Sequence, residues 1–206
     1  MTSKVFFSVS MSLDGFIAPD SPEELMGKQW MELQRWVFPL RFFRENLKLG
    51  GGGEEGRDND IVQAMYLRTG ASVMGKRMFD AGEQMWPDDP PFHTPVFVVT
   101  HERRESWQRL GGTVFHFVND GIESALTRAR EAAGEQDVRI AGGGETLVQY
   151  LNAGLIDEFH IALSPVLFGS GIRLFDDVEP GRVALDLVTA EPSPRATHLR
   201  YSVQQR

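Results

Sequence analysis

The 206-residue chain contains no cysteine, which excludes disulfides, thiolate nucleophiles, iron–sulfur clusters and cysteine-ligated zinc. It has no apolar run longer than a strand, so no membrane span is predicted. Basic residues are in the minority, with 21 against 29 acids and a net charge of -8. We therefore expect neither a nucleic-acid partner nor a membrane partner. The start of the chain, residues 1–7, lacks the features of a signal peptide, and we expect a cytoplasmic protein.

Several catalytic and metal-binding motifs are also missing. The five histidines are scattered and show no H-E-x-x-H or comparable ligand spacing, so no metal is predicted. The sequence has no G-x-S-x-G serine elbow and no Walker lysine motif. Serine hydrolases of that type and P-loop enzymes are therefore not expected.

Strand-like and helix-like segments alternate along most of the chain. This alternation predicts right-handed crossovers and a mainly parallel sheet with helices on both faces. The last two strand-like segments have no helix between them, which predicts an antiparallel hairpin at one edge. The strand-like segments are 5–10, 71–75, 96–100, 114–118, 138–141, 159–163, 183–188 and 198–203.

The segment 19–58 breaks this alternation. It is rich in aromatic residues, such as Trp30, Trp36 and Phe38, and contains four successive glycines at 50–53. Long segments without clean periodicity are typically a functional lid, a binding loop or a flexible insert. We predict a lid or insert within a single domain that spans 1–206.

The most informative motif is the glycine run Gly142 to Gly144, placed between a predicted strand and a predicted helix. Glycines let the backbone approach a ligand closely, and a helix start points unpaired N–H groups at an anion. A pyrophosphate would suit this loop, although a tight turn that needs positive φ is the structural alternative. The Rossmann pattern G-x-G-x-x-G is absent. Glu145, which follows the loop, would have to point away from phosphates.

Cations follow two other predicted strands. Lys76 and Arg77 come after Gly75, and His101 comes after Thr100. Open α/β sheets bind ligands at the C-terminal ends of parallel strands, so these residues are expected at the same edge as the glycine run. They could bind an additional phosphate, or each could be a solvated residue at a helix start. Arg103 and Arg104 are further candidates.

Acids near the first strand and the first long helix are candidate substrate ligands. Asp14, in Ser12-Leu13-Asp14-Gly15, could cap a turn or could hydrogen-bond a polar substrate. Asp58 and Asp60 could cap a helix, or one of them could face the cleft. The residues alone leave both pairs of alternatives open.

The motifs together resemble the dihydrofolate-reductase-like family, and specifically the reductase domain of bifunctional riboflavin-biosynthesis deaminase/reductases. The resemblance covers nearly the whole chain and is weakest from Pro19 to Asp58. It rests on the order and spacing of the segments 12–18, 73–79, 141–144, 155–161 and 165–171.

The resemblance implies a three-layer α/β sandwich with a mixed sheet of about eight strands, and NADPH as the hydride donor. It implies that Gly142, Gly143 and Gly144 hold the pyrophosphate. Asp14 would then act near the nicotinamide, as the catalytic residue. The other residues expected to bind the cofactor are Gly75, Lys76, Arg77, Thr100, His101, Glu145 and Thr146, and the expected substrate ligands are Ser12, Asp14 and Asp60.

We therefore expect an NADPH-dependent reductase that acts on a small heterocyclic or sugar-linked molecule. No Trp-Pro pair follows Asp14, which argues against folate reduction, and the deaminase half of the bifunctional enzymes is absent. The alternatives are a strict dihydrofolate reductase, an aminouracil-ribitol reductase, or a dinucleotide-binding protein without catalysis. We also predict a homodimer through the C-terminal hairpin, unless the aromatic segment covers that edge within one chain.

Overall fold

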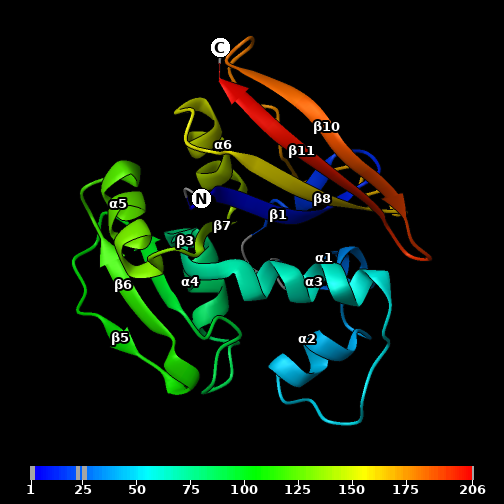
Figure 1. Ribbon diagram of the computed structural model, residues 1–206, viewed down its shortest axis with the longest axis horizontal. Helices are drawn as coiled ribbons and strands as arrows, with labels where there is room; N and C mark the ends of the chain where they lie inside the picture. The colour runs from blue at the N-terminus through cyan, green and yellow to red at the C-terminus, as the bar shows by residue number, and fades with distance from the viewer. Residues whose placement is uncertain (1–2, 22–23, 25–26, 206) are drawn as a thin grey trace.

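The computed structural model describes residues 3–21, 24 and 27–205 (Figure 1). The helices are α1 (Lys28–Leu33), α2 (Arg41–Asn46), α3 (Arg57–Arg68), α4 (Lys76–Glu83), α5 (Ile122–Ala133), α6 (Gly144–Asn152) and the 3-10 turn η2 (Leu110–Gly112). The strands are β1 (Val5–Ser12), β2 (Phe16–Ala18), β3 (Thr69–Gly75), β4 (Pro95–Val99), β5 (Trp107–Gln108), β6 (Val114–Val118), β7 (Asp137–Gly142), β8 (Glu158–Ser164), β9 (Ile172–Arg173), β10 (Val183–Pro192) and β11 (Thr197–Gln205).

Nine strands form one mixed sheet in the order β10-β11-β8-β1-β7-β3-β4-β6-β5. The six strands from β8 to β6 run parallel, whereas β11, β10 and β5 are antiparallel to their neighbours. Figure 1 shows the β10–β11 hairpin at one end of this sheet and β5–β6 at the other. The short strands β2 and β9 pair separately. The predicted fold class is confirmed.

Helices cover both faces because the central strands are apolar on both faces. On one face, α5 and α6 pack against side chains such as Val73, Ile140 and Ile161. On the other face, α4 packs against Met74 and its neighbours, while α3 crosses the strands nearer the hairpin (Figure 1). Alternate residues of one strand therefore serve two different cores, as a pleated strand requires.

The aromatic segment that the sequence left without periodicity packs on the same face as α3. Trp36 and Leu40 are buried with Val62 of α3, Ala162 of β8 and Ala196. This segment covers a face of the sheet beside β8 and β11.

Ion pairs fix the C-terminal end of α3 to the first residues of two central strands. The Arg68 guanidinium lies 2.6 Å from Asp137 of β7 and 2.7 Å from Glu158 of β8. The same guanidinium lies over the ring of Phe6, 4.1 Å from its centroid. Since α3 is tied to three central strands, its side chains hold a fixed position over the sheet.

Candidate active site

A cavity of about 990 Å³ opens at the C-terminal ends of the parallel strands. Its volume is at the upper end of the range for small-molecule and cofactor sites. One end is formed where β3, β4 and β7 meet the starts of α4 and α6, and the other end lies between β1, β8, α3 and the aromatic segment. The cavity therefore sits at the sheet edge where open α/β folds bind ligands.

All ten residues predicted to bind a cofactor line this one cavity. They are Gly75, Lys76, Arg77, Thr100, His101, Gly142, Gly143, Gly144, Glu145 and Thr146. The structure thus brings together residues as far apart in the sequence as Gly75 and Thr146. Whether they bind a cofactor stays a prediction.

The glycine loop lines the cavity with backbone atoms that carry no side chain. Gly142 ends β7 with a φ of 127°, a conformation that side-chain-bearing residues rarely adopt. Gly143 is the N-cap of α6, and a Cβ built there would meet no heavy atom within 4 Å. Because the first N–H groups of a helix have no partner inside it, the start of α6 is a suitable place for an anion.

Gly75 is held against the start of α6. A Cβ added to Gly75 would collide with the hydroxyl of Thr146, which is buried. The absence of a side chain at Gly75 therefore lets the end of β3 approach α6 closely, and this contact narrows that end of the cavity.

The two basic residues that follow Gly75 are fixed by partners at the rim. Lys76 Nζ lies 2.6 Å from Asp80 and 3.3 Å from Glu102, and the hydrogen bond that Lys76 donates to Asp80 raises the pKa of the Lys76 ammonium group. Arg77 donates to the carbonyl oxygen of Asp20 at 2.6 Å. Both cations lie at the rim; the three donors of Lys76 face the two Asp80 oxygens and Glu102, whereas the contact with Asp20 uses one of the five N–H donors of Arg77.

The two other arginines proposed from the sequence do not line the cavity. Arg104 pairs with Glu83 and lies over the rings of Phe79 and Phe117. Arg103 is exposed. The cluster of cations near the cavity is thus smaller than the sequence indicated.

The other end of the cavity combines aromatic walls with polar groups. Arg139 Nε is buried and has no hydrogen-bond partner among the described residues, and its guanidinium lies 5.6 Å from the centroid of the Tyr66 ring. Ser10 accepts a hydrogen bond from the Trp36 indole at 2.9 Å and donates to Gln34 at 2.8 Å. The aromatic residues here are Trp30, Trp36, Phe38, Phe43 and Tyr66, and the polar ones are Ser8, Ser10, Gln34, Arg139 and His160.

None of these polar residues was proposed from the sequence, although a signal was present. Ser8, Ser10, Arg139 and His160 each stand between apolar residues on a buried central strand. Central parallel strands are usually apolar on both faces, so polar residues at alternate positions indicate that one face borders a polar site.

Asp14 does not line the cavity and is instead committed to a loop. Its carboxylate accepts hydrogen bonds from the Ser12 hydroxyl at 2.7 Å and from the backbone N–H groups of Phe168 and Gly169 at 3.1 and 2.7 Å. The Ser12 hydroxyl and these two N–H groups lower the pKa of Asp14 to about 2. Ser12 lies in the same network, because its hydroxyl also accepts the N–H of Phe16. The structure therefore gives Asp14 a turn-capping position.

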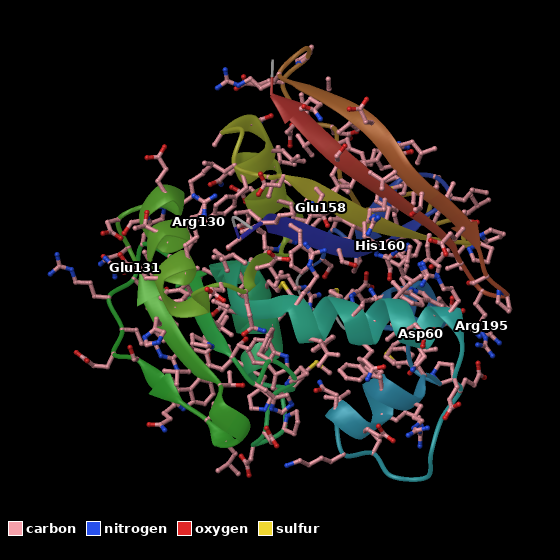
Figure 2. All side chains as sticks on the ribbon, viewed as in Figure 1. Asp60, Arg130, Glu131, Glu158, His160 and Arg195 are labelled. Carbon is pink, nitrogen blue, oxygen red and sulfur yellow. The ribbon has the colours of Figure 1, made fainter. Side chains whose placement is uncertain are left out.

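Of the two acids at the start of α3, Asp58 and not Asp60 faces the sheet. Asp58 is buried, whereas Asp60 is exposed and does not line the cavity. Residues two apart on a helix point to nearly opposite sides, so only one of the pair can face inward. Figure 2 shows Asp60 near the N-terminal end of α3 and His160 between β8 and that helix.

Asp58 begins a chain of hydrogen bonds that ends at the cavity. Its carboxylate lies 2.9 Å from His198 Nε2, and His198 Nδ1 lies 3.0 Å from His160 Nε2. His160 Nδ1 in turn lies 2.8 Å from Ser8 Oγ. Burial, followed by the nearby His198 and Arg200, lowers the pKa of His160 to about 3, so this imidazole is neutral at physiological pH.

No helix in the described part of the chain is long and apolar enough to cross a membrane. Within residues 3–21, 24 and 27–205, no group of three or more histidine, aspartate or glutamate side chains is arranged to hold a metal ion.

Comparisons with known proteins agree with this architecture. The uncharacterized protein YyaP of Bacillus subtilis is 28% identical over 122 residues, a match that covers 56% of this chain and 64% of that protein. The structure is similar to that of a putative riboflavin biosynthesis protein from Shewanella sp. PV-4, with a TM-score of 0.69, 24% identity and coverage of 98% and 99% of the two chains. It is also similar to Enterococcus faecalis dihydrofolate reductase complexed with NADP(H), with a TM-score of 0.57, 13% identity and coverage of 98% and 97%.

The solved structures are less than 25% identical to this chain, so they establish its fold. The family follows from the match to a family model, that of the RibD C-terminal domain, over residues 3–199. This match covers nearly the whole chain. The chain belongs to the RibD C-terminal domain family, which is a family of reductases.

Proposed function

We propose that this protein is an NADPH-dependent reductase that transfers a hydride to a small heterocyclic or sugar-linked molecule. The observation that carries the proposal is the continuity of one cavity. It joins a glycine loop with basic strand ends to a second compartment with aromatic walls and buried polar groups. A dinucleotide and a planar substrate could therefore meet within it.

The residues at the first end fit a dinucleotide. The open space at Gly143 and the start of α6 suit a pyrophosphate, while Lys76, Arg77 and His101 suit an additional phosphate at the rim. When bound, reduced nicotinamide supplies a hydride. The similarity to a dihydrofolate reductase complexed with NADP(H) supports this choice of cofactor.

The residues at the second end would bind and orient the substrate. Aromatic side chains such as Trp30 and Tyr66 can stack on a planar ring. The Nε of Arg139, which is buried without a hydrogen-bond partner among the described residues, calls for a hydrogen-bond acceptor, such as a carbonyl or anionic oxygen. The similarity to a putative riboflavin biosynthesis protein supports a heterocyclic substrate.

Binding of NADPH to the wild-type chain is the first test. A ligand at about 100 times its dissociation constant stabilises a protein by about 2.7 kcal/mol. For a chain of this size, that corresponds to a melting shift of roughly 5–10 °C. No shift with millimolar NADPH would contradict the proposal.

Oxidation of NADPH with a panel of compounds then separates the alternatives. Turnover of aminopyrimidines or other heterocyclic carbonyl compounds supports the proposal, and rapid turnover of dihydrofolate would support a strict dihydrofolate reductase. A protein that binds NADPH but oxidises it with no compound in a broad panel would be a dinucleotide-binding protein without catalysis.

A further inference from the structure

The chain of hydrogen bonds from Asp58 to Ser8 links a buried carboxylate to the end of the cavity where the substrate would lie. Asp58 and His198 are 8% and 2% exposed, whereas Ser8 and His160 line the cavity. Each link is between 2.8 and 3.0 Å long. Such a chain is suited to moving a proton between the interior and the cavity.

The fold fixes this chain through strand register and helix placement. Ser8 and His160 are direct neighbours on the parallel strands β1 and β8. The rings of His160 and His198 are nearly parallel, with an angle of 17° between their planes and 5.1 Å between their centroids, and His160 Nε2 lies 3.0 Å from His198 Nδ1. Trp36 packs edge-on against His198, 5.0 Å between centroids, and restricts the rotation of that ring.

The direction of each hydrogen bond follows from the carboxylate. Ionised Asp58 can only accept, so His198 carries a hydrogen on Nε2. When His198 is neutral, its Nδ1 accepts, so His160 donates from Nε2 and its Nδ1 accepts from the Ser8 hydroxyl. When His198 is protonated on both nitrogens, His160 must accept at Nε2 and carry its hydrogen on Nδ1. The two states differ by the reversal of every hydrogen bond between His198 and Ser8.

We propose that Ser8, His160, His198 and Asp58 form a proton relay that protonates the substrate from Ser8 Oγ. Ser8 is the donor that touches the substrate. Asp58 is a positioning residue that holds the proton on His198. This inference rests on the proposed function, because a hydride delivered to a C=N or C=O bond leaves negative charge that a proton must neutralise.

Each group between the substrate and His198 in the series of hydrogen bonds replaces the proton that it gives up. The Ser8 O–H bond breaks as a bond forms to the substrate nitrogen or oxygen that gained an electron pair from the hydride of NADPH. Ser8 Oγ then takes the proton of His160 Nδ1, and His160 Nε2 takes the proton of His198 Nδ1. His198 is left neutral, still donating from Nε2 to Asp58, so the relay loses one proton per hydride.

Other charged groups surround the relay and set its response to pH. Glu191 of β10 favours the protonated form of His160, whereas Arg200 of β11 opposes it. Glu191 is paired with Arg57 at the start of α3, and Arg195 lies close enough to Asp58 to be influenced by its charge. Arg139 of β7 faces the same cavity as Ser8.

Nitrogen NMR of the ¹⁵N-histidine-labelled chain tests the relay without substrate or NADPH. As the pH is lowered, reversal of the hydrogen bonds should move the His160 hydrogen from Nε2 to Nδ1, and the midpoint of this tautomer change is the measured quantity. In Asp58→Asn, the amide oxygen can still accept from His198, but the negative charge is lost. The midpoint of the His160 tautomer change should therefore lie at a lower pH than in the wild type. Asp60→Asn is the matched control on the same helix and should leave the midpoint unchanged.

Two NMR results would overturn the relay. One is a His160 ring that keeps its hydrogen on Nε2 over the whole pH range in which the protein stays folded. The other is an equal midpoint shift in Asp58→Asn and Asp60→Asn. Neither result depends on cofactor binding, so the relay can fail while NADPH still stabilises the protein, and the proposed function can fail while the two histidines remain coupled.

Turnover of a panel compound that the wild type reduces gives a second test. In Ser8→Ala, kcat should fall by about 10²–10⁴-fold, the usual contribution of a proton donor. The melting shift with NADPH should stay as in the wild type. Ser8→Thr keeps a hydroxyl on β1 and should restore most of kcat. A kcat in Ser8→Ala within about tenfold of the wild type would overturn the role of Ser8.

Discussion

The two ends of the cavity are built in different ways. The end proposed for the cofactor consists of three short segments, each at the C-terminal end of a strand and two of them at the start of a helix, and its main groups are backbone N–H groups and rim cations. The end proposed for the substrate consists of single side chains from β1, β7, β8, α3 and the aromatic segment. A site of the first kind tolerates changes in the rest of the chain, whereas a site of the second kind depends on how the whole sheet assembles.

The largest effect is expected at the cofactor end, from Gly143→Val. The new side chain would fill the space that is open at Gly143 and would block the approach of a pyrophosphate to the start of α6. We expect loss of the NADPH melting shift, while the melting temperature without ligand stays near that of the wild type. Thermal unfolding with and without NADPH measures both quantities. A full shift in Gly143→Val would move the cofactor away from this loop.

The next largest effect is expected at the substrate end, from Trp36→Ala. Trp36 is buried, donates to Ser10 and packs against His198. Truncation of a buried tryptophan destabilises a protein by about 3–5 kcal/mol. We expect this loss in urea denaturation, with NADPH still raising the melting temperature by the wild-type amount.

Trp36→Phe is the matched control, because it keeps an aromatic ring while removing the indole N–H and part of the ring system. A loss of about 1 kcal/mol is expected for the missing hydrogen bond. If Trp36→Ala also abolished NADPH binding, the two ends of the cavity would not be independent, and the comparison between them would fail.

The contrast between the two ends also explains what the sequence could predict. Short motifs such as Gly142 to Gly144 are contiguous, and their chemistry follows from local backbone conformation. Strand-end placement follows from the alternation of strands and helices. The same reasoning predicted the parallel sheet and the C-terminal hairpin, both of which the structure contains.

The substrate end could not be predicted in this way because its residues meet only through the fold. His160 and Ser8 are brought together by strand register, and the choice between Asp58 and Asp60 depends on the rotation of α3 about its axis. That rotation is set by contacts such as Arg68 with Asp137. The helices of the 19–58 segment were missed because each has only six residues and is stabilised by tertiary packing.

A moderate effect is expected at the rim of the cofactor end, from the double substitution Lys76→Ala and Arg77→Ala. Charge-assisted hydrogen bonds to a phosphate contribute about 1.5–3 kcal/mol each. We expect the dissociation constant of NADPH to rise by at least about tenfold and that of NADH to change little. Titration calorimetry with both cofactors measures this difference. Arg103→Ala, an exposed cation outside the cavity, is the control, and an equal loss for both cofactors would place the extra phosphate elsewhere.

We also predict a homodimer that forms through the sheet edge at β10. The strand β10 is the outermost strand, and Leu185 and Leu187 on it are 45% and 57% exposed. An unpaired edge with exposed apolar residues favours association with a second copy. Light scattering should give twice the chain mass of 23.1 kDa. Leu187→Lys should shift this mass toward the monomer, and Leu110→Lys near the opposite edge should not. A monomeric wild type would contradict the prediction.

The smallest effect is expected from Asp14→Asn, which tests whether the loop beside the cavity is structural. The pKa of Asp14 is lowered from 3.8 to about 2 by the Ser12 hydroxyl and the N–H groups of Gly169 and Phe168. A carboxylate with a lowered pKa stabilises the fold above its unfolded-state pKa, and this contribution is lost as the pH falls through about 2. The melting temperature of Asp14→Asn should therefore lie below that of the wild type at pH 5–7. The two melting curves should converge between about pH 4 and pH 2.

Turnover of a panel compound should fall by less than the hundredfold that is typical of a lost proton donor. A collapse of kcat with unchanged melting would instead make Asp14 the donor and remove the need for Ser8 in that role.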